Sequence, residues 1–422
     1  MSNLIVIKQK LKNFNKKITV SGDKSLSIRW VLFSSIADGV SKAHNLLMSD
    51  DVYAAIDAIK KLGVKVTIKK NLCKIFGNGI NGYKYKKNLV INAQNSGTLG
   101  RLILGLLVSS PTTIKLIGDK SLSKRDFERV TRPLKKFGVT FKLNKNKGLP
   151  LTIKGSNKLK AINYLEDKGS AQCKSSIIFA GMKSAGTTFI KAKKSRNHTE
   201  LLCKYLNLPI NVTTKNNYDF IRVNNVKKIK PLNYNIPSDI SSSAFFMVLT
   251  ALSKKSKLTI KNVNINPSRT GVITILKKMG VIILFKNTKI YKGERIADIH
   301  IKSPGNLKPI NCPKKLNSGA IDEFLVIFLL AAKAKGISSF KDLAELNQKE
   351  SPRLQWGAKI LNEMGIKTIL TNNSIRIFGN PNLEINKKII IKDYLKDHRV
   401  FMTSIIAALS FGGEWYIHDK DS

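Results

Sequence analysis

The chain of 422 residues has few cysteines, few acidic residues and no long apolar run. Its four cysteines, Cys73, Cys173, Cys203 and Cys312, lie far apart and form no C-x-x-C pair. That spacing argues against a zinc site or a disulfide framework and fits a reducing cytoplasm. The longest apolar run, residues 324–332, falls well short of the ~20 residues that a membrane span needs. We therefore expect a cytoplasmic protein with no bound metal and no membrane partner.

Acidic residues number only 27 against 74 basic ones, which gives a formal net charge of +47. An excess of this size is typical of proteins that bind nucleic acid or an anionic membrane surface. Here it consists almost entirely of lysine, spread along the whole chain without the long like-charge blocks of binding tails. We therefore interpret the charge as compositional bias and expect no nucleic-acid partner. A basic nucleic-acid-binding protein is kept as a remote alternative.

Arginine is scarce, with twelve residues in the whole chain. Where lysine fills the ordinary exposed positions, a retained arginine indicates a need for planar, bidentate binding of carboxylate or phosphate. Eight of the twelve fall at or near the starts of predicted helices: Arg29, Arg101, Arg125, Arg129, Arg132, Arg196, Arg353 and Arg399.

An internal repeat organises the chain. Six apolar segments rich in small residues begin near Ser25, Ser96, Ser170, Ser241, Ala320 and His398. Because they are apolar on nearly all sides, we predict six buried helices. An amphipathic series alternates with them, at residues 50–63, 125–138, 199–207, 270–280 and 353–365. Each amphipathic segment ends in Gly or Asn, which tolerate the left-handed backbone after a helix, and strand-like segments follow.

The repeating unit is therefore a buried helix, a strand, an amphipathic helix and a strand pair. The sixth unit stops before its amphipathic helix, so we expect a C-terminally incomplete or marginally stable chain. We expect the N-terminal strands LIVIKQ and KKITVSG to supply the sixth strand pair. The pattern predicts an α/β protein of two similar domains, residues 23–236 and residues 1–22 with 237–422. Two adjacent chain crossings would hinge them.

Polar or charged residues stand where the buried helices begin. They include Asp23-Lys24-Ser25, Asn95-Ser96-Gly97, Ser170-Ala171-Gln172, Asp322-Glu323 and Asp397-His398-Arg399. The free N–H groups and partial positive charge of a helix N-terminus attract anions. One such residue is usually only an N-cap, but the repeated pattern predicts a substrate with phosphate and carboxylate groups. A nucleic-acid duplex would need an open basic groove or a reading helix.

The chain contains, in this order, the motifs SGDKSLSIR, NSGTLGR, GDKSLSKR, SAQCKSS, RNHTE, NPSRTG, IDEF, KESPR and DHRVFM. They resemble the 5-enolpyruvylshikimate-3-phosphate synthases (3-phosphoshikimate 1-carboxyvinyltransferases) of the enolpyruvyl transferase family. The resemblance covers essentially the whole chain and implies two domains of three βαβαββ units each, an inside-out α/β barrel. It also implies a monomeric transferase without a cofactor, which moves the enolpyruvyl group of phosphoenolpyruvate to the 5-hydroxyl of shikimate 3-phosphate. Phosphate is released, in the shikimate pathway to chorismate and the aromatic amino acids.

The same resemblance assigns roles to individual residues. Shikimate 3-phosphate would be bound by Lys24, Ser25, Arg29, Ser170, Ala171, Gln172, Arg196, Asp322 and Lys349. Phosphoenolpyruvate would be bound by Lys24, Gly97, Arg125, Gln172, Arg353 and Arg399. Asp322 would be the base for the 5-hydroxyl, and Glu350 and Lys24 are candidates for proton transfer at C3 of phosphoenolpyruvate. Gly97 would leave room for the inhibitor glyphosate, which an alanine excludes in the family.

Two positions depart from the family pattern: Pro352 stands where Asp is usual, and Asp126 stands where Pro is frequent. Because proline is tolerated in the first turn of a helix, we expect Arg353 still to point inward. Within the family, the alternative is the enzyme that transfers enolpyruvyl to UDP-N-acetylglucosamine. That enzyme carries a Lys-Asn pair where this chain has Lys24-Ser25, and usually a loop cysteine, which GDKSLSKR lacks.

Overall fold

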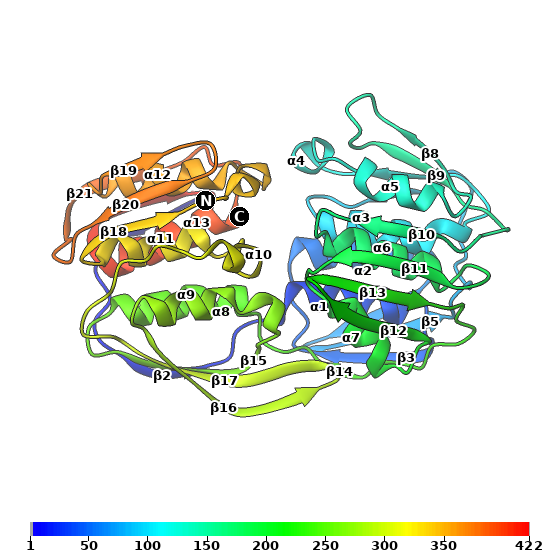
Figure 1. Ribbon diagram of the computed structural model, residues 1–422, viewed down its shortest axis with the longest axis horizontal. Coiled ribbons are helices and arrows are strands. Elements are labelled where there is room, and N and C mark those ends of the chain that lie inside the picture. Colours follow the sequence, from blue (N-terminus) through cyan, green and yellow to red (C-terminus); the bar gives the residue numbers. More distant parts are fainter. Residues whose placement is uncertain (1–2, 422) are drawn as a thin grey trace. The chain divides into compact units, whose positions relative to one another are not determined.

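The computed structural model describes residues 3–421, which form two units, each with its own hydrophobic core (Figure 1). Unit 1 holds the residues up to Val20, Ser238–Lys289, and those from Arg295 onward. Unit 2 holds Ser21–Pro237 and the short segment Ile290–Glu294. The chain therefore passes between the units four times, and the sequence pattern predicts only the two crossings near residues 22 and 237.

Unit 2 contains three four-stranded sheets, in the strand orders β14-β3-β5-β4, β6-β7-β9-β8 and β10-β11-β13-β12. In each sheet the first pair is parallel and the other two pairs are antiparallel. The strands are β3 (Asp38–His44), β4 (Lys65–Lys69), β5 (Leu72–Asn78), β6 (Val90–Asn92), β7 (Ile114–Ile117), β8 (Thr140–Leu143), β9 (Leu151–Lys154), β10 (Asn163–Glu166), β11 (Thr188–Lys193), β12 (Ile210–Lys215), β13 (Tyr218–Val223) and β14 (Tyr234–Asn235).

The helices of unit 2 confirm both predicted series. The buried ones are α1 (Lys24–Ser35), α3 (Gly97–Leu106) and α6 (Ala171–Gly181). The amphipathic ones are α2 (Asp50–Lys61), α5 (Glu128–Lys135) and α7 (His198–Tyr205), and a short α4 (Lys120–Ser123) precedes α5. Helix α5 begins three residues later than predicted: the Asp126 carboxylate accepts a hydrogen bond from the backbone N–H of Glu128 and forms a turn that precedes the helix.

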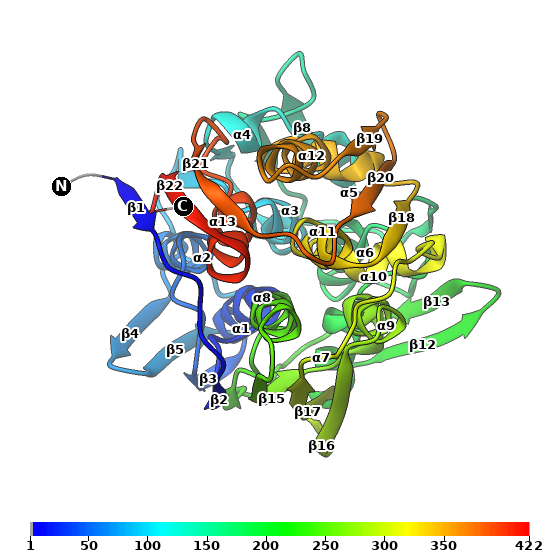
Figure 2. The ribbon, with the colours of Figure 1, turned by 90° about the vertical axis from the view of Figure 1, so that its left-hand side faces the viewer.

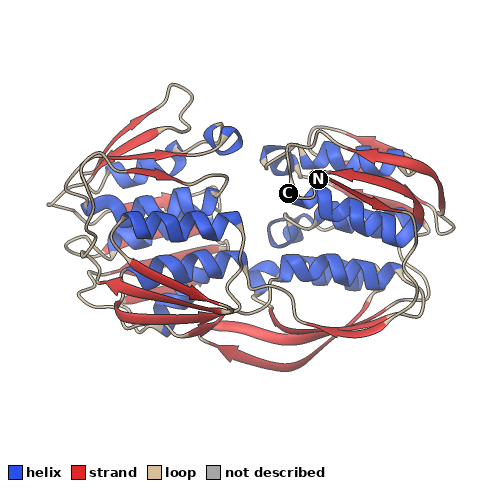
Figure 3. Cartoon of the chain, turned by 180° about the vertical axis from the view of Figure 1, so that it is seen from behind, coloured by secondary structure: helices blue, strands red, loops and turns tan. Residues whose placement is uncertain are grey.

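Unit 1 has the sheets β16-β17-β15-β2, β18-β20-β19 and β1-β22-β21. Their strands are β1 (Leu4–Ile7), β2 (Asn15–Ile18), β15 (Lys257–Asn264), β16 (Ile282–Tyr291), β17 (Glu294–Lys302), β18 (Gly336–Phe340), β19 (Thr368–Leu370), β20 (Ile375–Gly379), β21 (Ile385–Ile391) and β22 (Gly412–His418). The helices are α8 (Ile240–Leu252), α9 (Gly271–Lys278), α10 (Asn317–Ala320), α11 (Phe324–Lys333), α12 (Arg353–Glu363) and α13 (His398–Phe411). Figure 3 shows by colour how strands flank the helices of each unit.

The prediction that both N-terminal strands complete the sixth repeat is wrong for β2. Strand β1 does pair with β22, but β2 pairs in parallel with β15, the first strand after α8. Strand β14 behaves in the opposite way, since it precedes α8 in the chain and pairs with β3 in unit 2. The two strands that lead into α1 and α8 are thus exchanged between the units. This exchange gives the two crossings near residues 22 and 237.

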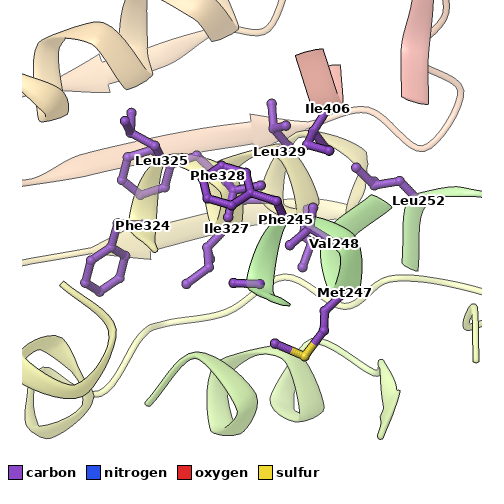
Figure 4. Packing of buried hydrophobic residues seen from close by; sticks show 14 of the residues in the cluster. Phe245, Met247, Val248, Leu252, Phe324, Leu325, Ile327, Phe328, Leu329 and Ile406 are labelled. Atoms are coloured by element: carbon purple, nitrogen blue, oxygen red, sulfur yellow. The ribbon is translucent and has the colours of Figure 1, made fainter. Parts of the chain in front are cut away.

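The core of unit 1 is built on α8, α11 and α13, which contact one another and are seen nearly end-on in Figure 2. Figure 4 shows Phe245 and Val248 of α8 packed near Phe328 and Leu329 of α11, with Ile406 of α13 beside them. Every residue of 324–332 is buried, as its all-round apolar sequence predicts. Each large apolar side chain so buried stabilises the fold by ~1.5–3 kcal/mol.

The amphipathic helices end as predicted. The residues after them, Gly63, Gly138, Asn207, Gly280 and Gly365, all have a positive φ. Glycine and asparagine adopt this left-handed conformation at least cost, so they fix where each helix stops. Within residues 3–421, no helix is long and apolar enough to cross a membrane.

The hairpin β16–β17 carries its tip, Ile290–Glu294, into unit 2. There Glu294 and His198 are fully buried, with Glu294 Oε1 2.7 Å from His198 Nδ1. The hydroxyl of Tyr291 accepts a hydrogen bond from the backbone N–H of Asn235, and its ring stacks on Tyr234. Residues far apart in the sequence therefore complete the core of unit 2.

Candidate active site

The predicted site residues form two groups, one in each unit. In unit 2 they gather where α1, α3 and α6 begin and in the loop that leads into α5. In unit 1 they gather in the turn before α11 and at the starts of α12 and α13. The buried helices α1, α3, α6, α11 and α13 thus have predicted site residues at or just before their N-terminal ends.

Several polar residues at these helix starts serve as N-caps. The side chains of Asp23, Ser96, Ser170 and Asp397 each accept a hydrogen bond from a backbone N–H in the first turn of α1, α3, α6 and α13. Ser170 is the one that we also predicted to contact a ligand. Its hydroxyl accepts from the N–H of Cys173 at 3.2 Å and can still donate its own hydrogen to an anion.

Lys24 and Arg29 lie on the first turns of α1. The ammonium group of Lys24 lies 3.3 Å from the carboxylate of Asp51 at the start of α2, a residue that the motif comparison did not single out. Arg29 is almost fully buried and donates to the hydroxyls of Thr199 and Ser175 and to the carbonyl oxygen of Ser25. It therefore braces α1 against α6 and α7.

The charge of Arg29 is set by its surroundings. Burial lowers the pKa of its guanidinium to about 10, and the negative charge of Glu200 opposes that effect. The positive charge of Arg196 lowers the pKa further, so the structure brings these two predicted residues into electrostatic contact. Two arginines close enough to repel each other favour the binding of an anion beside them.

Five residues meet at the start of α3. Arg101 Nη1 donates to Gln172 Oε1 at 2.6 Å, and the amide nitrogen of Gln172 donates to the hydroxyl of Thr98. A Cβ placed on Gly97 would lie 3.2 Å from Nη1 of both Arg101 and Arg125. Gly97, Arg125 and Gln172, which we predicted as site residues, are therefore neighbours.

The sequence places Arg101 near the start of a predicted helix, but the family resemblance assigns it no binding or catalytic role. Burial, followed by the charges of Arg129 and Arg125, lowers the pKa of its guanidinium to about 10. Its Nε is buried and donates no hydrogen bond to any residue that the structure describes. A cluster of three arginines with an unused donor can bind a phosphate or carboxylate group. Its position four residues after Gly97 on α3 is the signal that could have identified it.

Asp126, one of the two departures from the family pattern, has a structural explanation. Besides accepting the backbone N–H of Glu128 in the turn before α5, it offers its backbone carbonyl oxygen to Nη2 of Arg101 at 3.4 Å. The other departure, Pro352, stands immediately before α12 and leaves the helix intact. Arg353 is 3% exposed, as we predicted for an inward-pointing side chain.

Arg353 is bound by carboxylates on three sides. Its Nε lies 2.9 Å from Asp397, its Nη2 2.5 Å from Glu350, and its Nη1 3.5 Å from Asp322. Burial lowers the pKa of Arg353, but the charges of Glu350, Asp397 and Asp322 outweigh it and raise the pKa above the usual value. Arg353 in turn lowers the pKa of Asp397, against the effect of burial.

Asp322 lies in the turn before α11, with its side chain 19% exposed. Its Oδ1 is 3.5 Å from the ammonium group of Lys349 and equally far from Nη1 of Arg353. Two cations at this distance stabilise the negative charge that a general base must carry. The structure therefore brings Asp322, Lys349, Arg353 and Glu350 together, as the resemblance implied.

Arg399, in the first turn of α13, is buried but has fewer carboxylate partners than Arg353. Its Nη1 lies 3.9 Å from Oε1 of Glu323, and its guanidinium stands 5.7 Å from the ring centre of Phe245. Neither Nε nor Nη1 donates a hydrogen bond to any of residues 3–421. Arg399 therefore has donors to offer an anion.

Metal-ligating residues do not gather anywhere in the described part of the chain: no group of three His, Cys, Asp or Glu residues there could hold an ion.

Comparisons with known proteins show which family the chain resembles. The family model described as "EPSP synthase (3-phosphoshikimate 1-carboxyvinyltransferase)" matches residues 8–422. The chain is 36% identical over 412 residues to the 3-phosphoshikimate 1-carboxyvinyltransferase of Caldicellulosiruptor bescii, covering 97% of this chain and 94% of that one. It is 40% identical over 393 residues to the protein of that name from Ruthia magnifica, covering 93% and 88%. The solved EPSP synthase of Acinetobacter baumannii superposes with a TM-score of 0.87 at 36% identity, covering 99% and 94%.

Proposed function

The chain belongs to the EPSP synthase family, and from that premise we propose that it transfers the enolpyruvyl group of phosphoenolpyruvate to the 5-hydroxyl of shikimate 3-phosphate, releasing phosphate. The observation that carries this proposal is the cluster of Arg101 and Arg125 around Gly97 at the start of α3, with Gln172 beside it. A substrate with both a carboxylate and a phosphate needs such a set of convergent donors.

In unit 2, phosphoenolpyruvate binds Arg125, Gln172 and Lys24 and approaches the backbone at Gly97. Arg101, which the structure adds, orients Gln172 through a 2.6 Å hydrogen bond. Shikimate 3-phosphate binds the remaining predicted residues of the unit: Ser25, Arg29, Ser170, Ala171 and Arg196, with Lys24 and Gln172 shared by both substrates. The buried donors of Arg29 and the N-terminal end of α6 suit its 3-phosphate.

In unit 1, Asp322 acts as the base. It accepts the proton of the 5-hydroxyl while that oxygen bonds to C2 of phosphoenolpyruvate and C3 gains a proton, which gives a tetrahedral intermediate. Loss of a proton from C3 then breaks the bond between C2 and the phosphate oxygen and restores the double bond. Glu350 and Lys24 are the groups that supply the proton to C3 and remove it again. General acid–base groups of this kind contribute a factor of ~10²–10⁴ in rate.

The remaining unit 1 residues bind the substrates. Lys349 pairs with Asp322 and contacts the shikimate ring, while Arg399 and Arg353 bind phosphoenolpyruvate. Arg399 is the stronger candidate of the two arginines, since Arg353 already holds three carboxylates. The acceptor is shikimate 3-phosphate rather than UDP-N-acetylglucosamine, a choice supported by the names of the relatives at 36% and 40% identity.

The finer architecture is part of the proposal. Three small mixed sheets in each unit support two inside-out α/β barrels of three βαβαββ units, hinged where the chain crosses. All four cysteines are free and buried, which supports a reducing cytoplasm. We place the protein there as a monomer that needs no cofactor.

Release of phosphate from purified protein tests the function. With both substrates present, phosphate should appear in proportion to enzyme, and neither substrate alone should give any. UDP-N-acetylglucosamine in place of shikimate 3-phosphate should be inert. Release that depends on UDP-N-acetylglucosamine, or no release with both proposed substrates, would overturn the proposal.

A further inference from the structure

A second carboxylate, Glu323, directly follows Asp322 and lies inside unit 1. Its side chain is 2% exposed and stands where α11 begins. The hydroxyl of Ser241, in the first turn of α8, donates a hydrogen bond to its Oε1. The same oxygen is the atom that lies 3.9 Å from Nη1 of Arg399 on α13. Glu323 thus joins the starts of all three buried helices, yet neither the predicted roles nor the proposed mechanism uses it.

The two unit 1 arginines assigned to phosphoenolpyruvate have different partners. Nε and Nη2 of Arg353 are engaged in hydrogen bonds to Asp397 and Glu350. Arg399 faces Glu323 at a distance beyond a hydrogen bond, with two nitrogens that donate to nothing among the described residues. Glu323 therefore offsets part of the positive charge of Arg399 and leaves its donors to a ligand.

The charge on Glu323 is itself sensitive to its surroundings. Burial and the neighbouring carboxylate of Asp322 raise its pKa, and Arg399, Arg269 and the Ser241 hydroxyl oppose that shift without cancelling it. Arg269 is also bound to Asp239, the cap of α8. Glu323 consequently gains and loses its proton at higher pH than an exposed glutamate.

We propose that Glu323 is a positioning residue: it holds Arg399 in place and, when ionised, partly neutralises the positive charge of the Arg399 guanidinium. Affinity for the phosphoenolpyruvate anion is therefore kept low and rises when Glu323 is protonated. This rests on the proposed function, because it takes phosphoenolpyruvate as the anion that reaches Arg399. Ionised Glu323 and the substrate repel each other across one guanidinium. Binding of the substrate therefore draws a proton from solvent onto Glu323.

The variant Glu323→Gln keeps the shape and the acceptor for Ser241 but removes the charge. At pH 8 we expect its KM for phosphoenolpyruvate to be about three- to tenfold lower than that of the wild type, because one repulsion is gone. The difference should shrink as the pH is lowered and wild-type Glu323 takes up a proton. The KM for shikimate 3-phosphate should stay within about twofold. Glu384→Gln removes an exposed carboxylate from the same unit, where it pairs with Lys10, and should change neither KM.

Two further measurements keep the inference open to refutation. If Glu323→Gln does not fold, Ser241→Ala removes the hydroxyl that stabilises the ionised form, and it should lower the same KM to a smaller degree. Phosphoenolpyruvate should also raise the melting temperature of the protein when it binds. The size of that rise measures binding even when no turnover occurs. A protein that binds phosphoenolpyruvate but releases no phosphate overturns the proposed function alone. A KM and a melting shift that are unchanged, or weaker binding at every pH, overturn the role of Glu323 alone.

Discussion

Replacing Gly97 by alanine separates the stability of the protein from its function. The backbone at Gly97 has no positive φ, so an alanine fits the first residue of α3 without backbone strain. Alanine is favoured over glycine in a helix by up to about 1 kcal/mol. In a unit of this size that raises the melting temperature by at most ~2–4 °C. The added methyl group meets Arg101 and Arg125 instead of empty space.

The geometry gives the size of the functional effect. The new Cβ would lie 3.2 Å from Nη1 of both arginines, whereas unstrained contacts begin near ~3.5 Å. Both guanidinium groups must therefore withdraw by roughly 0.3–0.5 Å. A misplacement of 1 Å costs about a hundredfold in rate, so this displacement lowers kcat/KM for phosphoenolpyruvate roughly four- to tenfold. Inhibition by glyphosate, which we expect at millimolar concentration in the wild type, should weaken in the variant.

Initial rates of phosphate release at varied phosphoenolpyruvate, together with thermal unfolding, measure both effects. Gly100→Ala is a matched control in the same helix, because its Cβ would meet the ring of Phe127 at the same 3.2 Å and no guanidinium nitrogen. We expect that control to keep kcat/KM within about twofold. Equal losses in both variants would show that the helix, and not the two arginines, transmits the effect. An unchanged kcat/KM in Gly97→Ala would refute the reasoning outright.

Other variants test single groups. Asp322→Asn and Lys24→Met should each lower kcat by ~10²–10⁴ with little change in melting temperature, and near-normal phosphate release would exclude that residue from proton transfer. Arg125→Ala should raise the KM for phosphoenolpyruvate more than it lowers kcat. An unchanged KM in steady-state kinetics would contradict this. Burial lowers the pKa of Lys183 to about 8, so its folded form holds fewer protons than the unfolded chain between pH 8 and 10.5. Lys183→Met should accordingly be more stable than the wild type at pH 7, with an advantage in denaturant titrations that shrinks by pH 10. Burial raises the pKa of Cys173 to about 12, so iodoacetamide should leave it unlabelled at pH 8 despite its place beside Gln172.

The helices were predictable because their signals are local. A segment such as 324–332, apolar on every side, can only be buried, and a glycine such as Gly63 can stop a helix by its backbone alone. Besides the late start of α5, a second boundary was wrong: the helix predicted from Ala320 is interrupted, and α11 begins at Phe324. The intervening turn places Asp322 and Glu323, so the break serves the site.

Strand partners and second carboxylates were not predictable in this way. A strand as short as Asn15–Ile18 does not specify whether it pairs with β15 or with a strand of the sixth repeat, since that depends on contacts 242 residues away in the chain. Asp51 and Glu323 look like ordinary helix-start residues in the sequence. Only the fold brings one to Lys24 and the other to Arg399.

The exchange of β2 and β14 also governs the order in which the protein can assemble during synthesis. Almost all of unit 2 is one continuous stretch, so it can form as the ribosome releases it. Strands β1 and β2 are made long before their partners β22 and β15, and meanwhile their edges stay open to wrong partners. Unit 2 in turn gains its last buried carboxylate only when Glu294 emerges and meets His198. Strands β1 and β2 are therefore among the last elements to reach their native neighbours, although they precede both units' helices in the chain.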